Sequence, residues 1–92
     1  MTLELRKLLS LSTGHVTDPA TREMLNDNTS ENYPTLGGST HYGWFVYANE
    51  ENHYNIPADL WACMVFARLH GADYILFDCD AGPVEGLPWV EF

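Results

Sequence analysis

The sequence predicts a single small α/β or α+β domain, in which a three- to four-stranded sheet carries two helices on one face. The 92 residues are the length of one domain. Apolar residues make up 46% of the chain and include many aromatics, which disordered acidic chains lack. Strand-like segments alternate with segments that carry helix start signals. The expected order is β-α-β-α-β with a final short β, over residues 1–92, with one long loop at 28–42.

The first half of the chain predicts a strand, a helix and the loop. Residues 5–13 contain a leucine-rich run that favours a strand. Asp18 followed by Pro19 is typical of a helix start, because proline lacks the N–H that is unpaired in a first turn. A helix is therefore expected over 19–27, and the polar, glycine-containing segment 28–42 is expected to be a loop with a turn at 37–40. The helix positions expected to face the core are Ala20, Met24 and Leu25.

The second half predicts two strands around a longer helix. Residues 43–48 are rich in aromatic and β-branched side chains, and residues 73–79 form the clearest strand. Pro57 and Asp59 mark a helix start, and Gly71 is expected to cap that helix at its end. Residues 89–92 predict a short edge strand. The apolar positions of this helix that recur at helical spacing, and are expected to face the core, are Ala58, Trp61, Ala62, Val65, Phe66 and Leu69.

The charge of the chain limits its partners. It carries 13 acidic against 4 basic residues, a net charge of −9, which repels nucleic acid and anionic membranes and attracts basic protein surfaces. No apolar stretch approaches the ~18 residues of a membrane span, and the N-terminus is charged where a signal peptide is apolar. A soluble, cytoplasmic protein is therefore expected. Cys63 and Cys79 lie in apolar runs without metal-type spacing and predict two buried, reduced thiols, with a disulfide as the alternative.

Four segments together resemble a known family: LSLSTGHVT at 9–17, GWFVY at 43–47, IPADL at 56–60 and DYILFDCD at 73–80. They are similar to a family of short uncharacterised proteobacterial proteins carried on plasmids and integrated mobile elements. The similarity covers most of the chain except the loop at 28–42. The family has no assigned activity, so the resemblance implies only a context, in which small acidic proteins often inhibit host defence systems.

The main functional hypothesis is an acidic binding protein without enzymatic activity or cofactor. Its carboxylates would occupy a basic nucleic-acid-binding surface of a partner protein or complex, gaining the ion pairs and counterion release that phosphates would gain. An anti-CRISPR or anti-restriction inhibitor is the concrete form of this hypothesis, while ordinary solubility is the competing explanation of the acidity. No direct contact with nucleic acid or membrane is expected. The residues proposed to contact the partner are Glu50, Glu51, Asp59, Asp78, Asp80 and Glu85 for charge, with Tyr47, His53 and Tyr54 as anchors.

The alternative hypothesis is a small metal- or ligand-binding protein. Asp78 and Asp80 follow the clearest strand, and carboxylates at this spacing can share a hard cation such as Mg²⁺. If the strands are parallel, their ends meet at one edge of the sheet, where His15 and Asn49 would join them, and the metal set would be His15, Asp78 and Asp80. The competing interpretation is that one aspartate caps the turn after the strand. A third hypothesis is an oligomer or antitoxin-like partner that uses the aromatics at 89–92.

Overall fold

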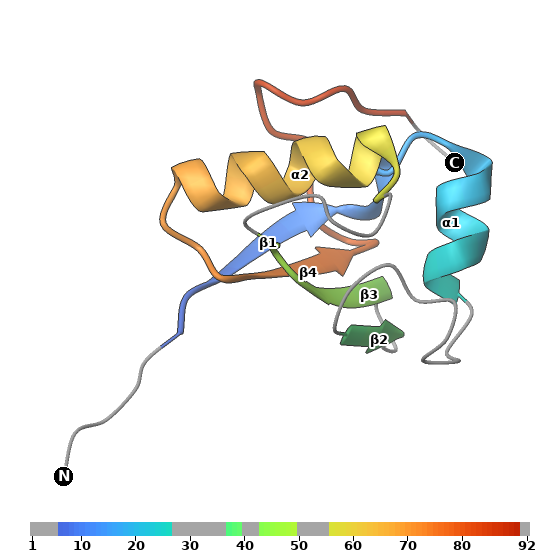
Figure 1. Ribbon diagram of the computed structural model, residues 1–92. Coiled ribbons are helices and arrows are strands. Elements are labelled where there is room, and N and C mark those ends of the chain that lie inside the picture. The colour runs from blue at the N-terminus through green and yellow to red at the C-terminus, as the bar shows by residue number, and fades with distance from the viewer. Residues whose placement is uncertain (1–5, 27–36, 40–42, 50–55, 91–92) are drawn as a thin grey trace, which may run out of the picture.

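The computed structural model describes residues 6–26, 37–39, 43–49 and 56–90. Its strands form one mixed sheet in the order β1-β4-β3-β2, and α2 lies over one face of that sheet (Figure 1). The predicted class, a small α+β domain with two helices, is confirmed. The elements follow the chain as β1 (Leu8–Ser12), the 3₁₀ helix η1 (Thr13–His15), α1 (Pro19–Asn26), β2 (Gly37–Ser39), β3 (Gly43–Tyr47), α2 (Ala58–Leu69) and β4 (Tyr74–Asp78).

The central strand β4 has one parallel and one antiparallel neighbour. β1 is parallel to β4, with Leu8 opposite Tyr74 and Ser12 opposite Asp78. β3 is antiparallel to β4, so Tyr47 also lies opposite Tyr74. The carboxyl ends of β1 and β4 therefore share one edge of the sheet, and the carboxyl end of β3 lies at the opposite edge.

Strand β2 lies inside the segment that was expected to be a loop. Its residues 37–39 pair antiparallel with β3, so the predicted turn at this position is wrong. Gly37 and Gly38 carry no side chain, and the strand therefore lacks the alternating pattern by which strands are recognised. The rest of the expected loop at 28–42 lies outside the described residues.

The core lies between the sheet and α2. Alternate strand residues are buried, as a sheet with one covered face requires, and this side is called the core face below. The buried strand residues of the core face are Leu11, Trp44, Val46, Ile75 and Phe77. Helix α2 contributes Leu60, Cys63, Met64 and Ala67, each at most 1% exposed.

The face of α2 that was expected to be buried is the wrong one. Leu69 is 80% exposed and Val65 is 39% exposed, while Trp61 and Phe66 are only partly buried against the core. The helix is apolar on nearly every side, so two apolar stripes exist at helical spacing and the periodicity does not choose between them. Burial selects the stripe with Leu60 and Met64.

Helix α1 begins as predicted and contacts the same face of the sheet. The Asp18 carboxylate accepts a hydrogen bond from the Ala20 N–H at 2.9 Å, the expected cap. Trp44 of the core face donates from Nε1 to the Asn26 side chain at 2.8 Å, and the Arg22 guanidinium lies 5.4 Å from the centre of the Trp44 ring. The buried side of the helix is formed by Thr21 and Leu25; Ala20, which was expected there, is exposed.

Gly71 ends α2 as the sequence predicts. Its φ of +80° lies in the left-handed region that glycine adopts without strain. The Gly71 N–H donates to the Arg68 carbonyl at 3.0 Å, and the Ala72 N–H donates to the Ala67 carbonyl at 2.9 Å. These two bonds form a Schellman motif, which satisfies carbonyls that the end of a helix would leave unpaired.

Residues 84–90, called the strap below, run back across the domain over α2 (Figure 1). The Trp89 indole donates to the Ser12 hydroxyl at 2.9 Å, and the Val90 N–H donates to the Gly14 carbonyl at 3.0 Å. No strand is formed at 89–90, and the remainder of the expected edge strand lies outside the described residues. The strap therefore attaches through η1 and the end of β1. Among the described residues, no helix has the length and apolar character needed to cross a membrane.

Candidate functional site

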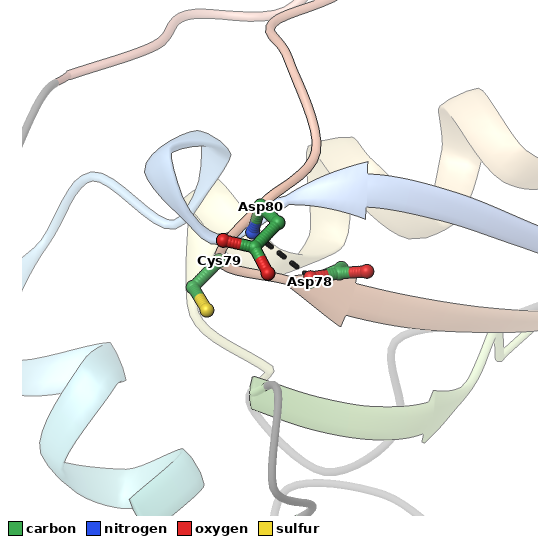
Figure 2. A group of neighbouring side chains, drawn as sticks. All are labelled: Asp78, Cys79 and Asp80. Carbon is green, nitrogen blue, oxygen red and sulfur yellow. Dashed lines mark hydrogen bonds between the residues drawn. The ribbon is translucent and has the colours of Figure 1, made fainter.

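Asp78, Cys79 and Asp80 form a small polar cluster where β4 ends (Figure 2). Each offers one ligand-type atom, and these atoms lie within 4.8 Å of one another. The Asp80 N–H donates to Oδ1 of Asp78 at 2.9 Å, so Asp78 caps the turn, as the competing interpretation of this pair predicts. Cys79 and Asp80 are exposed and Asp78 is half-buried. The carboxylates therefore face solvent around a locally ordered turn.

His15 has a structural role that the sequence did not indicate. Its side chain is only 2% exposed. Nε2 accepts a hydrogen bond from the Val84 N–H at 3.1 Å, so the proton resides on Nδ1, which donates to the Pro88 carbonyl at 2.8 Å. Both ring nitrogens thus hold the strap. A metal site that uses His15 together with Asp78 and Asp80 would have to break at least one of these two bonds, whereas the cluster at the end of β4 needs no such change.

Asn49 does not join the aspartates. It follows β3, and the antiparallel register puts the end of β3 at Tyr47, opposite Tyr74. Asp78 lies at the other end of β4, beside Gly43. The expected cluster required every strand to be parallel, and only β1 meets that condition relative to β4. The prediction for Asn49 is therefore wrong.

Asp59 is occupied by contacts inside the domain. Its carboxylate accepts hydrogen bonds from the Thr21 hydroxyl at 2.8 Å and from the Leu60 N–H at 2.9 Å through Oδ1, and from the Asp18 N–H at 3.1 Å through Oδ2. These bonds join the first turns of α1 and α2. Asp59 is thus a structural carboxylate, and it contributes less to a docking surface than the exposed acids.

Two of the four basic residues serve the interior of the domain. Arg22 donates to the carbonyls of Val16 at 2.9 Å and Thr13 at 2.7 Å. Burial lowers the pKa of Arg22, and the negative charge of Asp59 opposes that change. Arg68 donates to the Ala48 carbonyl at 2.6 Å. It also pairs with Asp73 at 3.1 Å.

Two other groups of charged residues lie at opposite ends of the sheet. Arg6 and Lys7 directly precede β1, and this region is called the basic end; the Lys7 N–H also bonds the Asp73 carboxylate at 3.2 Å. Asp78 and Asp80 form the acidic end. The parallel register of β1 and β4 puts Asp78 beside Ser12, five residue steps beyond Lys7, which is roughly 17 Å at ~3.3 Å per residue. Asp73 lies at the basic end, where it pairs with Arg68, whereas no ion pair is found for Asp78 or Asp80 among the described residues.

Of the other proposed contact residues, the structure describes Tyr47 and Glu85. Tyr47 is near the basic end, where its ring centre lies 5.0 Å from the Arg68 guanidinium and 5.5 Å from the Tyr74 ring. Glu85 is exposed in the strap. Four proposed residues lie outside the described part of the chain, namely Glu50, Glu51, His53 and Tyr54.

The second face of the sheet is not among the sites that the sequence predicts. The strand residues that alternate with the core face lie there, and we call this side the open face, defined by Leu8, Phe45, Tyr47, Tyr74 and Leu76. Phe45 and Tyr74 stack with their ring centres 5.2 Å apart. Leu8 is 51% exposed, and the other four are half-buried. Residues 43–47 and 74–78 are apolar at successive positions, so the sequence does not distinguish this face from the core face.

The two cysteines are free but differ in environment. Cys63 is 1% exposed, and its thiol lies 3.9 Å from the His15 carbonyl. Burial, with a smaller contribution from the charge of Asp59, raises the pKa of the Cys63 thiol to about 12. Cys79 is exposed, so the prediction of two buried thiols is wrong for Cys79. The thiolate is the reactive form, and Cys63 has almost none at neutral pH.

We expect the native protein to titrate one thiol with an aromatic disulfide reagent at pH 8 and two thiols in denaturant. The Cys79→Ser variant should titrate none when native, whereas Cys63→Ser should titrate one thiol both when native and in denaturant. Rapid reaction of two thiols without denaturant would contradict the burial of Cys63.

The architecture defines a small acidic α+β domain with two neighbouring carboxylates where β4 ends and a strap held by a buried histidine. The chain belongs to a family described as a family of unknown function (DUF5983), C-terminal domain, whose model matches residues 8–92. This match confirms the resemblance to an uncharacterised family. No curated protein and no solved structure matches the chain.

Proposed function

We propose that this protein is a binding protein whose acidic end occupies a basic, nucleic-acid-binding surface of a partner protein or complex. The observation that carries the proposal is the pair of carboxylates at the acidic end, Asp78 and Asp80. Among the described residues, neither Asp78 nor Asp80 pairs with a basic side chain. Their carboxylates are therefore available to the cations of a partner.

The internal use of arginine strengthens this argument. Arg22 and Arg68 bond backbone carbonyls, and Arg68 also pairs with Asp73. The net charge of −9 already includes both cations. A partner that normally binds phosphates presents Lys and Arg, and a carboxylate surface gains comparable ion pairs and ion release. Inhibition of a host defence complex encoded against mobile elements, such as a CRISPR or restriction complex, is the specific form that we propose.

The test removes the charge of the acidic end without disturbing its turn. In the double variant Asp78→Asn/Asp80→Asn, the amide oxygen of residue 78 still accepts from the N–H of residue 80, so the local structure is retained. The immobilised protein is incubated with extract of the native host, and retained proteins are eluted either with short duplex DNA or with salt. We expect duplex DNA to elute a nucleic-acid-binding partner, retention to weaken steeply with salt, and the double variant to retain at least ~10-fold less partner.

The matched control is Glu23→Gln, which removes an exposed carboxylate of α1, combined with Asp18→Asn, which keeps a side-chain acceptor for the Ala20 N–H. This control has the same net charge as the test variant. Equal loss of partner in both variants would show that net charge alone acts, and retention that duplex DNA does not compete would contradict a shared site.

A further inference from the structure

The strap depends on a single imidazole for half of its hydrogen bonds to the domain. Among the described residues, four hydrogen bonds join it to the rest of the chain. His15 makes two of them, since its ring accepts from the Val84 N–H at 3.1 Å and donates to the Pro88 carbonyl at 2.8 Å. The strap forms no helix or strand of its own. Its attachment is therefore sensitive to the chemical state of the His15 ring.

The strap covers apolar surface of the domain. Val84 and Leu87 are partly buried and pack against the core. A Cβ added at Gly86 would lie 3.4 Å from the Phe66 ring, so the backbone of the strap passes close to this ring of α2 (Figure 1). Detachment of the strap therefore exposes the side chains of Val84, Leu87 and Phe66 to water.

A protonated His15 ring is incompatible with the attached strap. A neutral imidazole has one acceptor nitrogen, and the Val84 N–H occupies it. An imidazolium has a hydrogen on both nitrogens and accepts no bond. A second proton on the ring would therefore replace the bond from Val84 by a contact between two donors. Histidine ordinarily gains this proton between about pH 8 and pH 5, so mild acid supplies it.

The surroundings of His15 offer the imidazolium no counter-charge. The charged and titratable groups that lie toward η1 are Arg22 of α1, Asp59 and Cys63 of α2, Asp78 and Asp80 where β4 ends, and Glu85 of the strap. Arg22 is itself a cation, and its guanidinium bonds the Thr13 carbonyl of η1. Cys63 stays neutral because burial raises the pKa of its thiol to about 12. Among the described residues, no carboxylate forms an ion pair with the His15 ring.

We propose that the strap is a pH-dependent switch, attached while His15 is neutral and detached when the ring is protonated. The detached form binds one more proton than the attached form, so a fall in pH favours detachment, by up to ~10-fold in the equilibrium constant per pH unit. Mild acid thus uncovers an apolar surface on α2 that neutral pH keeps closed. This inference goes beyond the proposed function, because the experiments that test it leave Asp78 and Asp80 unchanged.

The first test follows amide hydrogen exchange of the native protein from pH 7.5 to pH 5.5. Rates are converted to protection factors, which removes the intrinsic pH dependence of exchange. We expect the protection of the Val84 and Val90 amides to fall at least ~10-fold relative to the amides of α2. Trp89 fluorescence should shift to the red over the same range, and binding of an apolar dye should rise. Protection of the strap amides that stays constant over this range overturns the proposal.

His15→Gln is the variant that separates the imidazole from other titrating groups. Its amide oxygen accepts a hydrogen bond as Nε2 does, and it gains no proton in this range. We expect lower protection of the strap than in the native protein at pH 7.5, with less than ~2-fold change down to pH 5.5. The matched control is His70→Ala, which removes an exposed imidazole and should keep the native response. A native pH response in His15→Gln would assign the opening to another group and overturn the proposal.

A measurement on the native protein keeps the proposal testable if His15→Gln does not fold. NMR of the imidazole nitrogens reports when Nε2 of His15 gains its proton. We expect this event to coincide with the loss of protection at the Val84 amide, because the two hydrogens compete for the same place. Protonation of Nε2 while the Val84 amide remains protected overturns the proposal.

Discussion

Replacing Gly43 by alanine is expected to destabilise the fold by about 3 kcal/mol or more. A Cβ at this position would collide with the carbonyl oxygen of Phe77, and it would lie 3.0 Å from the methyl group of Thr13. The carbonyl belongs to β4, which pairs with β3 on one side and β1 on the other. The backbone cannot withdraw without weakening the centre of the sheet, so the clash persists. Urea denaturation should show a lower transition midpoint.

Gly82→Ala is the matched control for this experiment. A Cβ at Gly82 meets no atom within 4 Å, so the unfolding free energy should stay within ~0.5 kcal/mol of the native value. If both variants unfold at the same urea concentration, the close approach of β3 and β4 at Gly43 is not as described.

Replacing His15 by alanine is expected to cost about 3 kcal/mol and to release the strap. The substitution leaves a cavity in a site that is 2% exposed. It also removes the partners of the Val84 N–H and the Pro88 carbonyl. Hydrogen exchange at the Val84 and Val90 amides should accelerate at least ~10-fold relative to the amides of α2, and Trp89 fluorescence should shift to the red. Thermal unfolding measures the loss of global stability.

His70→Ala provides the comparison for His15. His70 is exposed and follows α2, where its ring lies 4.5 Å from the Phe66 ring. Its removal should change the unfolding free energy by less than about 1 kcal/mol and leave the strap amides protected. Equal exchange rates in both variants would contradict the role assigned to the buried imidazole.

The sequence predicted where the principal elements lie better than it predicted which sides they bury. The Asp18 cap, the Gly71 cap and the strands β3 and β4 follow from local chemistry that a few neighbouring residues determine. The orientation of α2 does not, because Leu60 and Leu69 are equally apolar and only the sheet beneath the helix distinguishes them. β2 was not predicted because its residues Gly37 and Gly38 have no side chains, so the segment shows no hydrophobic pattern.

The candidate site depended on information that is not local. Grouping His15 and Asn49 with Asp78 required strand direction, and β3 runs antiparallel to β4. The use of His15 by the strap joins residues 69 positions apart, and no spacing within the sequence indicates it. The turn after β4 could be predicted from the sequence, because an Asp at position i commonly accepts a hydrogen bond from the N–H of residue i+2.

The pairing of β1 with β4 also has a kinetic consequence. These adjacent strands come from distant parts of the chain, as the bond between Lys7 and Asp73 spans 66 positions. Closing so long a loop costs entropy before the pairing compensates for it, and such topologies fold in milliseconds to seconds. Until that loop closes, the apolar edge of β4 has no neighbour on one side. Nascent or refolding molecules therefore pass through an interval in which association between chains competes with completion of the sheet.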